Sequence, residues 1–102
     1  MKQRWTKQLH LGERVVLTPR FLRTWNALQH QQRRQMEPKL RLLATNARHP
    51  SLQVHRHHQI GGDIWICYVS RGQRLLYSQE GATLYLYEIG SHNIVDRAHE
   101  RY

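Results

Sequence analysis

Residues 64–91, IWICYVSRGQRLLYSQEGATLYLYEIGS, decide the fold, because apolar and polar side chains alternate there with a period close to two. Such alternation is typical of strands with one buried face. Turn residues interrupt it twice, at Ser70-Arg71-Gly72 and at Glu80-Gly81. Three short strands are therefore predicted, at 64–69, 74–78 and 83–89, and strands joined by such tight turns form an antiparallel meander.

The residues before this meander predict one more strand and two helices. Residues 14–18 (RVVLT) are a short β-type run, and Thr18-Pro19 combines a helix N-cap with proline at the first helical position. Apolar residues at 21, 25 and 28 predict a helix that ends near residue 29 or 30. Apolar residues at 36, 40 and 43 predict a second helix over roughly 32–46. Because proline is tolerated only near the start of a helix, Pro38 places the start of this helix between residues 31 and 37.

The predicted element order is β-α-α-β-β-β, which defines an α+β domain. Two N-terminal helices are expected to pack on one face of a small antiparallel sheet, leaving the other face free for function. At 102 residues the chain is expected to be one domain, 1–102, with a lead-in at 1–13 and a tail at 98–102.

The formal net charge is +9, and the charge is concentrated in the first half of the chain. Residues 1–51 hold eleven Lys/Arg and two Asp/Glu, whereas residues 52–102 hold five of each sign and five of the eight histidines. A polyanionic partner is therefore the first hypothesis. Cys67 is the single cysteine, which excludes an internal disulfide. Because no secretory signal or membrane-spanning run is found, we expect a cytoplasmic protein without membrane association.

Three motifs occur in order along the chain, and together they resemble those of a known family. They are His49-Pro50-Ser51-Leu52 followed by His55, then Arg74-Leu75-Leu76-Tyr77, then Ile89-Gly90-Ser91-His92. Over roughly residues 14–97 the chain resembles the RelE/ParE superfamily of bacterial type II toxin–antitoxin toxins. The resemblance implies an RNase, a RelE-like mRNA interferase, that cleaves mRNA on the ribosome without a metal or other cofactor. It also implies a cognate antitoxin as partner, which we expect to be small and acidic and to neutralise the basic surface; a DNA-binding role for the antitoxin is left open.

Metal-free RNA cleavage needs a base for the attacking 2′-OH, an acid for the leaving 5′-oxygen, and positive charge at the phosphate. His92 and Arg74 match family positions, for an acid or base and for a phosphate-binding arginine. His55 also matches a family position, and His57 shares its face if the segment is extended. The alternatives are ordinary surface histidines and a surface arginine paired with Glu88 or Asp63. A zinc site would need His55, His57, Cys67 and His92 together, and their spacing gives it no support.

A wider set of residues is predicted to contact RNA. Arg56 and His58 extend the histidine-rich stretch, Trp65 can stack on an unpaired base, and Arg97 lies near the tail. On the second helix the candidates are Arg33, Arg34, Lys39 and Arg41. Core packing is the alternative for Trp65, and a solvated helix face is the alternative for the four helix residues.

Two other functions remain open at this stage. The superfamily includes toxins of the same fold that block DNA gyrase without cleaving RNA, so the fold alone does not decide the activity. The net charge equally suits a basic nucleic-acid-binding module without catalysis.

Overall fold

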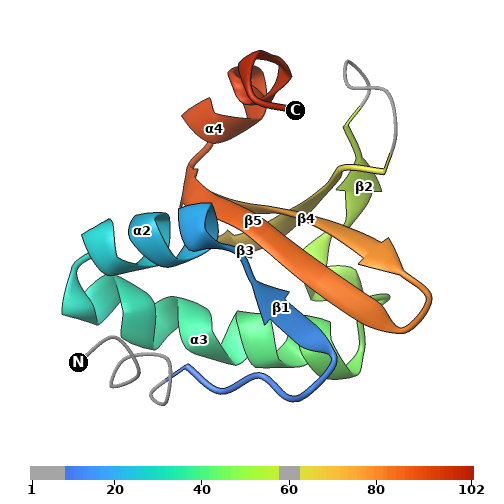
Figure 1. Ribbon diagram of the computed structural model, residues 1–102. Helices are drawn as coiled ribbons and strands as arrows, with labels where there is room; N and C mark the ends of the chain where they lie inside the picture. Colours follow the sequence, from blue (N-terminus) through green and yellow to red (C-terminus); the bar gives the residue numbers. More distant parts are fainter. Residues whose placement is uncertain (1–8, 58–62) are drawn as a thin grey trace.

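A computed structural model describes residues 9–57 and 63–102 and defines two layers, shown in Figure 1. Two helices cover one face of a sheet, and a short C-terminal segment lies on the other face. The elements are β1 (Val15–Leu17), α2 (Pro19–Ala27), α3 (His30–Thr45), the 3-10 turn η1 (Pro50–Leu52), β2 (His55–Arg56), β3 (Trp65–Ser70), β4 (Gln73–Glu80), β5 (Thr83–Ser91), α4 (Asn93–Asp96) and the 3-10 turn η2 (Ala98–Glu100). The predicted α+β architecture with a helical pair on one sheet face is confirmed.

The sheet has the strand order β1-β5-β4-β3-β2 and is mixed rather than wholly antiparallel. β3, β4 and β5 form the predicted antiparallel meander. β1 instead runs parallel to β5, with Val16 opposite Tyr85. This pairing joins distant parts of the chain, so no local turn signal could indicate its direction. β2 is a two-residue strand at the opposite edge that the sequence did not predict.

Both helices begin at recognisable caps. The Thr18 hydroxyl accepts a hydrogen bond from the Phe21 amide at the start of α2. A reciprocal capping box between Gln29 and Gln32 starts α3 at His30, earlier than predicted. Pro38 therefore lies inside α3 rather than near its start. It lies on the exposed side of the helix, where water can satisfy the carbonyl four residues earlier, so the helix continues through it.

The main core lies between the helices and the sheet. Phe21 and Trp25 of α2 and three buried residues of α3 pack against inward-facing side chains of β3, β4 and β5. Cys67, Leu75 and Leu86 are at most 1% exposed on this side of the sheet. Within the described part of the chain, no helix is both long enough and apolar enough to cross a membrane.

The sequence predicted that the opposite face of the sheet is free. In the structure, part of this face is covered. α4 and η2 pack there, with Ala98 buried against Ile66 and Leu76. The Tyr102 ring lies 5.5 Å from the Tyr87 ring, measured between centroids. The packing of this C-terminal segment, residues 93–102, was not predicted, because its apolar residues are too few and too irregularly spaced to indicate an element. The segment begins at the end of the sheet near the β3–β4 turn, where Ile94 lies against Gly90.

Candidate functional site

The strand register places Arg74 on the face opposite the helices. Arg74 lies across from Tyr68 on β3 and from Gly90 on β5, while its neighbour Leu75 points into the helix-side core. The guanidinium carbon is 4.7 Å from the centroid of the Tyr68 ring. The same guanidinium donates to the carbonyls of Ser70 at 3.3 Å and Gln73 at 2.9 Å. Arg74 is thus a half-buried, preoriented cation at the end of a rigid hairpin.

His92 lies at the same end of the sheet. It follows β5 directly and occupies the N-cap position of α4, with its side chain exposed. Its backbone amide donates to the carbonyl of Gly72 at 3.1 Å, which fixes His92 beside the β3–β4 turn. The structure therefore brings together two of the four residues for which catalytic roles were predicted: an exposed imidazole just after β5 and an arginine on the neighbouring strand β4.

His55 lies on the same face at the far edge of the sheet. It pairs with Ile66, and Ile66 belongs to the cluster on the face opposite the helices. β2 and β4 are separated by β3 alone, so the His55 and Arg74 strands are roughly 10 Å apart. Nδ1 of His55 lies 2.8 Å from the carbonyl oxygen of Gln53. Because a carbonyl only accepts, the contact favours the tautomer with the proton on Nδ1, which leaves Nε2 of the neutral ring as a base.

His57 is 8% exposed, and its ring binds the tail. Nε2 lies 2.8 Å from the carbonyl oxygen of Val95, and the backbone amide donates to Ile64. The ring thereby connects the edge of the sheet to α4. This contact suits a residue that positions the tail, and the catalytic role predicted for His57 stays a prediction.

Arg56 and Trp65 lie on the helix side, away from His55 and His57. They are cross-strand partners, and the Arg56 guanidinium carbon is 5.6 Å from the Trp65 ring centroid. Arg56 also forms an exposed ion pair with Asp63 at 3.0 Å. Trp65 packs partly against the main core. His58, the remaining member of the histidine-rich stretch, lies outside the described residues.

The basic residues of α3 lie on the other side of the molecule from Arg74 and His92. Arg33 donates to backbone carbonyls at the end of α2, including that of Leu28. Arg41 donates to Glu37 and to the carbonyl of His10, which ties the lead-in to α3. Arg34 is exposed and Lys39 half-buried on the same helix. Arg97, by contrast, lies in the tail and pairs with Glu100 at 3.3 Å. RNA contact by these residues remains a prediction, and Arg33 and Arg41 also have structural roles.

The four residues considered for zinc do not converge. Cys67 is buried in the helix-side core, whereas His55, His57 and His92 belong to the opposite face. Burial raises the pKa of the Cys67 thiol to about 12, which keeps the sulfur protonated and unreactive. Among residues 9–57 and 63–102, no group of three or more His, Cys, Asp or Glu side chains is placed to hold a metal ion.

Several residues that shape these surfaces have contacts that the sequence did not predict. Tyr68 supports Arg74, and Glu88 is a 3%-exposed carboxylate under the tail. The Tyr102 hydroxyl donates to Glu88 at 3.1 Å, and the Arg101 guanidinium lies 3.4 Å from the same carboxylate. Strand alternation could have indicated Tyr68. No local sequence pattern links Glu88 to Arg101 and Tyr102, which follow it by 13 and 14 positions.

The comparisons with known proteins rest on structure. No protein-family model and no curated protein sequence matches the chain. The toxin of the Escherichia coli DinJ–YafQ complex is similar, with a TM-score of 0.67 and 16% identity over 78% of this chain and 92% of that one. The isolated E. coli RelE toxin has a TM-score of 0.59 and 19% identity over 85% and 95% of the two chains. A conserved hypothetical protein of Helicobacter pylori has a TM-score of 0.54 and 18% identity over 78% and 94%.

These similarities cover most of each chain and agree with the motifs and with the two-layer arrangement of Figure 1. The chain therefore has the fold of the RelE and YafQ toxins.

Proposed function

We propose that this protein is the toxin of a type II toxin–antitoxin system and a ribosome-dependent mRNA endoribonuclease. The observation that carries the proposal is the placement of half-buried Arg74 and exposed His92 at one end of the sheet, in a toxin fold. Neither residue is enclosed in the core, so both can reach a large substrate. The proposed reaction is attack of a ribose 2′-OH on the adjacent phosphate, without a metal or cofactor.

Arg74 is proposed to bind the phosphate under attack. Its guanidinium is always charged and can contact two phosphate oxygens at once. Tyr68 and the carbonyls of Ser70 and Gln73 hold it in place before substrate arrives. A preoriented cation stabilises the negative charge that develops in the transition state without first having to reorganise.

His92 and His55 are proposed to carry the protons. In-line displacement places the attacking and leaving oxygens on opposite sides of phosphorus, so the acid and the base must also flank it. Arg74 lies on β4, between β5, which leads into His92, and the edge strand β2, which carries His55. His92 is exposed, and the Gln53 carbonyl orients the ring of His55. His57 is proposed to hold the tail beside this site.

The distribution of charge supports the proposed partners. The net charge of +9 and the basic side chains of α3 suit ribosomal RNA on the helix side, while mRNA crosses the opposite face. An acidic antitoxin would be attracted by the same charge. Such an enzyme would act in the cytoplasm, where translation occurs.

The test compares His92→Gln with His30→Gln, since both histidines are exposed and His30 lies at the start of α3 on the helix side. Each purified variant is added to an in vitro translation reaction, and new mRNA 5′ ends are mapped. We expect His92→Gln to lower the cleavage rate about 10²–10⁴-fold, the usual contribution of a general acid or base. His30→Gln should cleave like the unmodified protein.

Two results would overturn the proposal. One is that the unmodified protein leaves mRNA intact with and without ribosomes. The other is growth arrest in cells that is equal for both variants and accompanied by DNA damage, which would favour a gyrase-blocking toxin of the same fold.

A further inference from the structure

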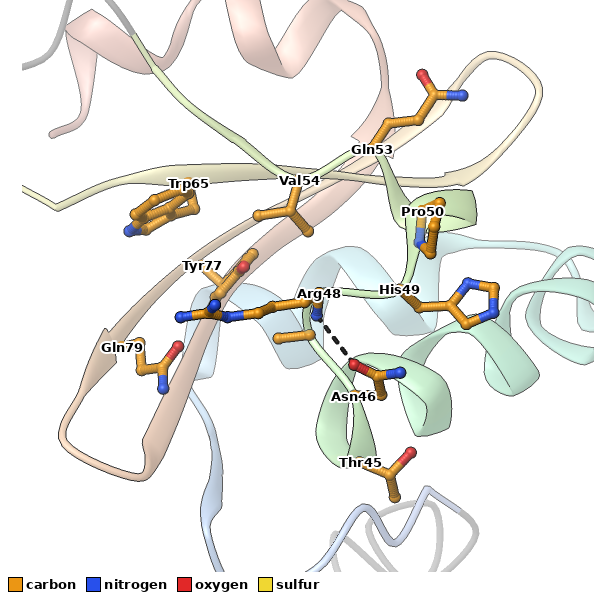
Figure 2. A pocket seen from close by; sticks show the side chains of 11 residues that line it. Thr45, Asn46, Arg48, His49, Pro50, Gln53, Val54, Trp65, Tyr77 and Gln79 are labelled. Carbon is orange, nitrogen blue, oxygen red and sulfur yellow. Dashed lines mark hydrogen bonds between the residues drawn. The ribbon is translucent and has the colours of Figure 1, made fainter.

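A cavity of about 730 Å³ opens on the helix side of the sheet, away from Arg74 and His92. It lies between the loop that follows α3 and the ends of β3 and β4, and Figure 2 shows the eleven residues that line it. Its volume falls within the range of small-molecule binding sites, which is roughly 300–1,000 Å³. Among the described residues, its lining contains no aspartate or glutamate.

The loop wall of this cavity is rigid. The Asn46 side chain accepts a hydrogen bond from the Arg48 amide at 3.3 Å, drawn as the dashed line in Figure 2. The His49 amide donates to the Asn46 carbonyl, and the Nδ1 of His49 caps the turn that begins at Pro50. The cavity is therefore largely preformed, which lowers the entropic cost of binding a ligand.

Arg48 extends across the cavity toward β4, the strand that carries Tyr77 and Gln79 (Figure 2). Within the part of the chain that the structure describes, nothing accepts a hydrogen bond from its guanidinium. The cavity thus contains an exposed cation on a fixed backbone without an internal counter-charge, and such a cation is available to an anionic ligand.

The strand wall supplies a hydroxyl and an aromatic surface. Tyr77 is 2% exposed, and among residues 9–57 and 63–102 its hydroxyl has no hydrogen-bond partner. This hydroxyl is not among the fully enclosed polar atoms, so it can donate a hydrogen bond to a ligand in the cavity. Burial, and then the nearby Cys67, raise the pKa of this phenol, so that it stays a neutral donor. Trp65, half-buried, contributes its indole ring to the same wall.

We propose that this cavity binds one unpaired nucleotide, with its base against Trp65 and its phosphate at Arg48. A flat aromatic surface, a fixed guanidinium and neutral donors are the groups that recognise a nucleotide in single-stranded form. The nucleotide is either a free mononucleotide or one residue of a single-stranded RNA, because the two share this chemistry. The site lies on the opposite face from Arg74 and does not depend on the proposed cleavage activity.

The test follows binding to the purified full-length chain by NMR of the tryptophan indole N–H groups, with Trp65 assigned from Trp65→Phe. The probes are 5′-AMP, adenosine and a short 2′-O-methyl oligoadenylate that cannot be cleaved through a 2′-OH. Addition of 5′-AMP should shift the Trp65 indole and leave that of the buried Trp25 unchanged.

Arg48→Gln is compared with Arg23→Gln, which removes the same charge from an exposed position on α2. Arg48→Gln should weaken 5′-AMP binding about tenfold, the effect of losing one charge-assisted hydrogen bond. Arg23→Gln should change it less than about twofold, and adenosine binding should not respond to Arg48→Gln. Tyr77→Phe, which removes the hydroxyl alone, should also weaken 5′-AMP binding.

The oligoadenylate separates the two sources of the nucleotide. Equal weakening of both probes by Arg48→Gln would place an RNA residue in the cavity, and weakening of 5′-AMP alone would assign a free nucleotide. The proposal is overturned if 5′-AMP leaves the Trp65 indole unmoved, or if Arg48→Gln and Arg23→Gln act alike. Displacement of the indole signal by an acidic peptide alone would overturn it too, since the surface would then bind a protein.

Discussion

Tyr102→Phe should destabilise the protein measurably, because it removes one hydroxyl that binds a buried charge. The Glu88 carboxylate is 3% exposed and accepts from this hydroxyl at 3.1 Å. Burial, and then Glu88 itself, raise the pKa of Tyr102, so the hydroxyl is a donor throughout the neutral range. Hydrogen bonds to charged groups contribute about 1.5–3 kcal/mol. Tyr102 is only half-buried, which favours the lower end, and phenylalanine keeps the ring contact with Tyr87.

A loss of about 1.5 kcal/mol corresponds to a fall in Tm of about 6–12 °C for a domain of this size. Urea unfolding at pH 7 gives the free energy directly, and Tyr85→Phe on β5 is the control. In the double-mutant cycle with Glu88→Gln, the coupling between the two positions should be about 1 kcal/mol. A Tyr102→Phe protein within about 0.5 kcal/mol of the unmodified one, with no coupling to Glu88, would show that this hydrogen bond does not stabilise the fold.

Two other substitutions test the site and the core. Arg74→Lys should lower kcat/KM for mRNA cleavage at least about tenfold, because lysine offers a point charge instead of two parallel donors; unchanged kinetics would argue against phosphate binding at this position. Cys67→Ala tests the raised thiol pKa through the dependence of stability on pH. The thiol ionises from about pH 9 in the unfolded chain but near pH 12 in the folded one, so its contribution is complete below pH 9 and is lost as the pH rises toward 12. The variant should therefore lose stability less steeply above pH 9, by up to about 1.4 kcal/mol per pH unit, in urea unfolding series at pH 8 to 11; equal slopes would contradict the assignment.

The meander and the helical pair could be predicted because local patterns determine them. The alternation in 64–91 and the turns at Gly72 and Gly81 gave strands close to those observed, and both glycines have positive φ. Thr18-Pro19 gave the start of α2. The parallel pairing of β1 with β5 could not be predicted, because it joins residues about 70 positions apart.

The site was partly predictable for the same reason. Arg74 and His92 lie near one hairpin, so the strand register brings them together without information from elsewhere in the chain. Strand alternation alone predicts that Arg56 and His55 lie on opposite faces of the sheet. The contacts of Tyr102 with Glu88 and of His57 with Val95 depend on how the tail folds back, and no spacing encodes that.

The position of the tail makes the roles of His92 and His55 experimentally separable. Arg74 and Gly90 lie at the end of the sheet where α4 begins, whereas His55 shares its row with Ile66 and Leu76, which lie beneath Ala98. An RNA strand that used Arg74 and His92 alone would not need to pass Ala98 and Tyr102, farther along the C-terminal segment. An RNA strand that also reached His55 would run along the edge of the C-terminal segment. Loosening that segment would therefore alter the path of the RNA. If His55 shares the proton transfers, Tyr102→Phe should change cleavage as well as stability. If cleavage at a temperature where the variant stays folded is unaffected, Arg74 and His92 carry the reaction without His55.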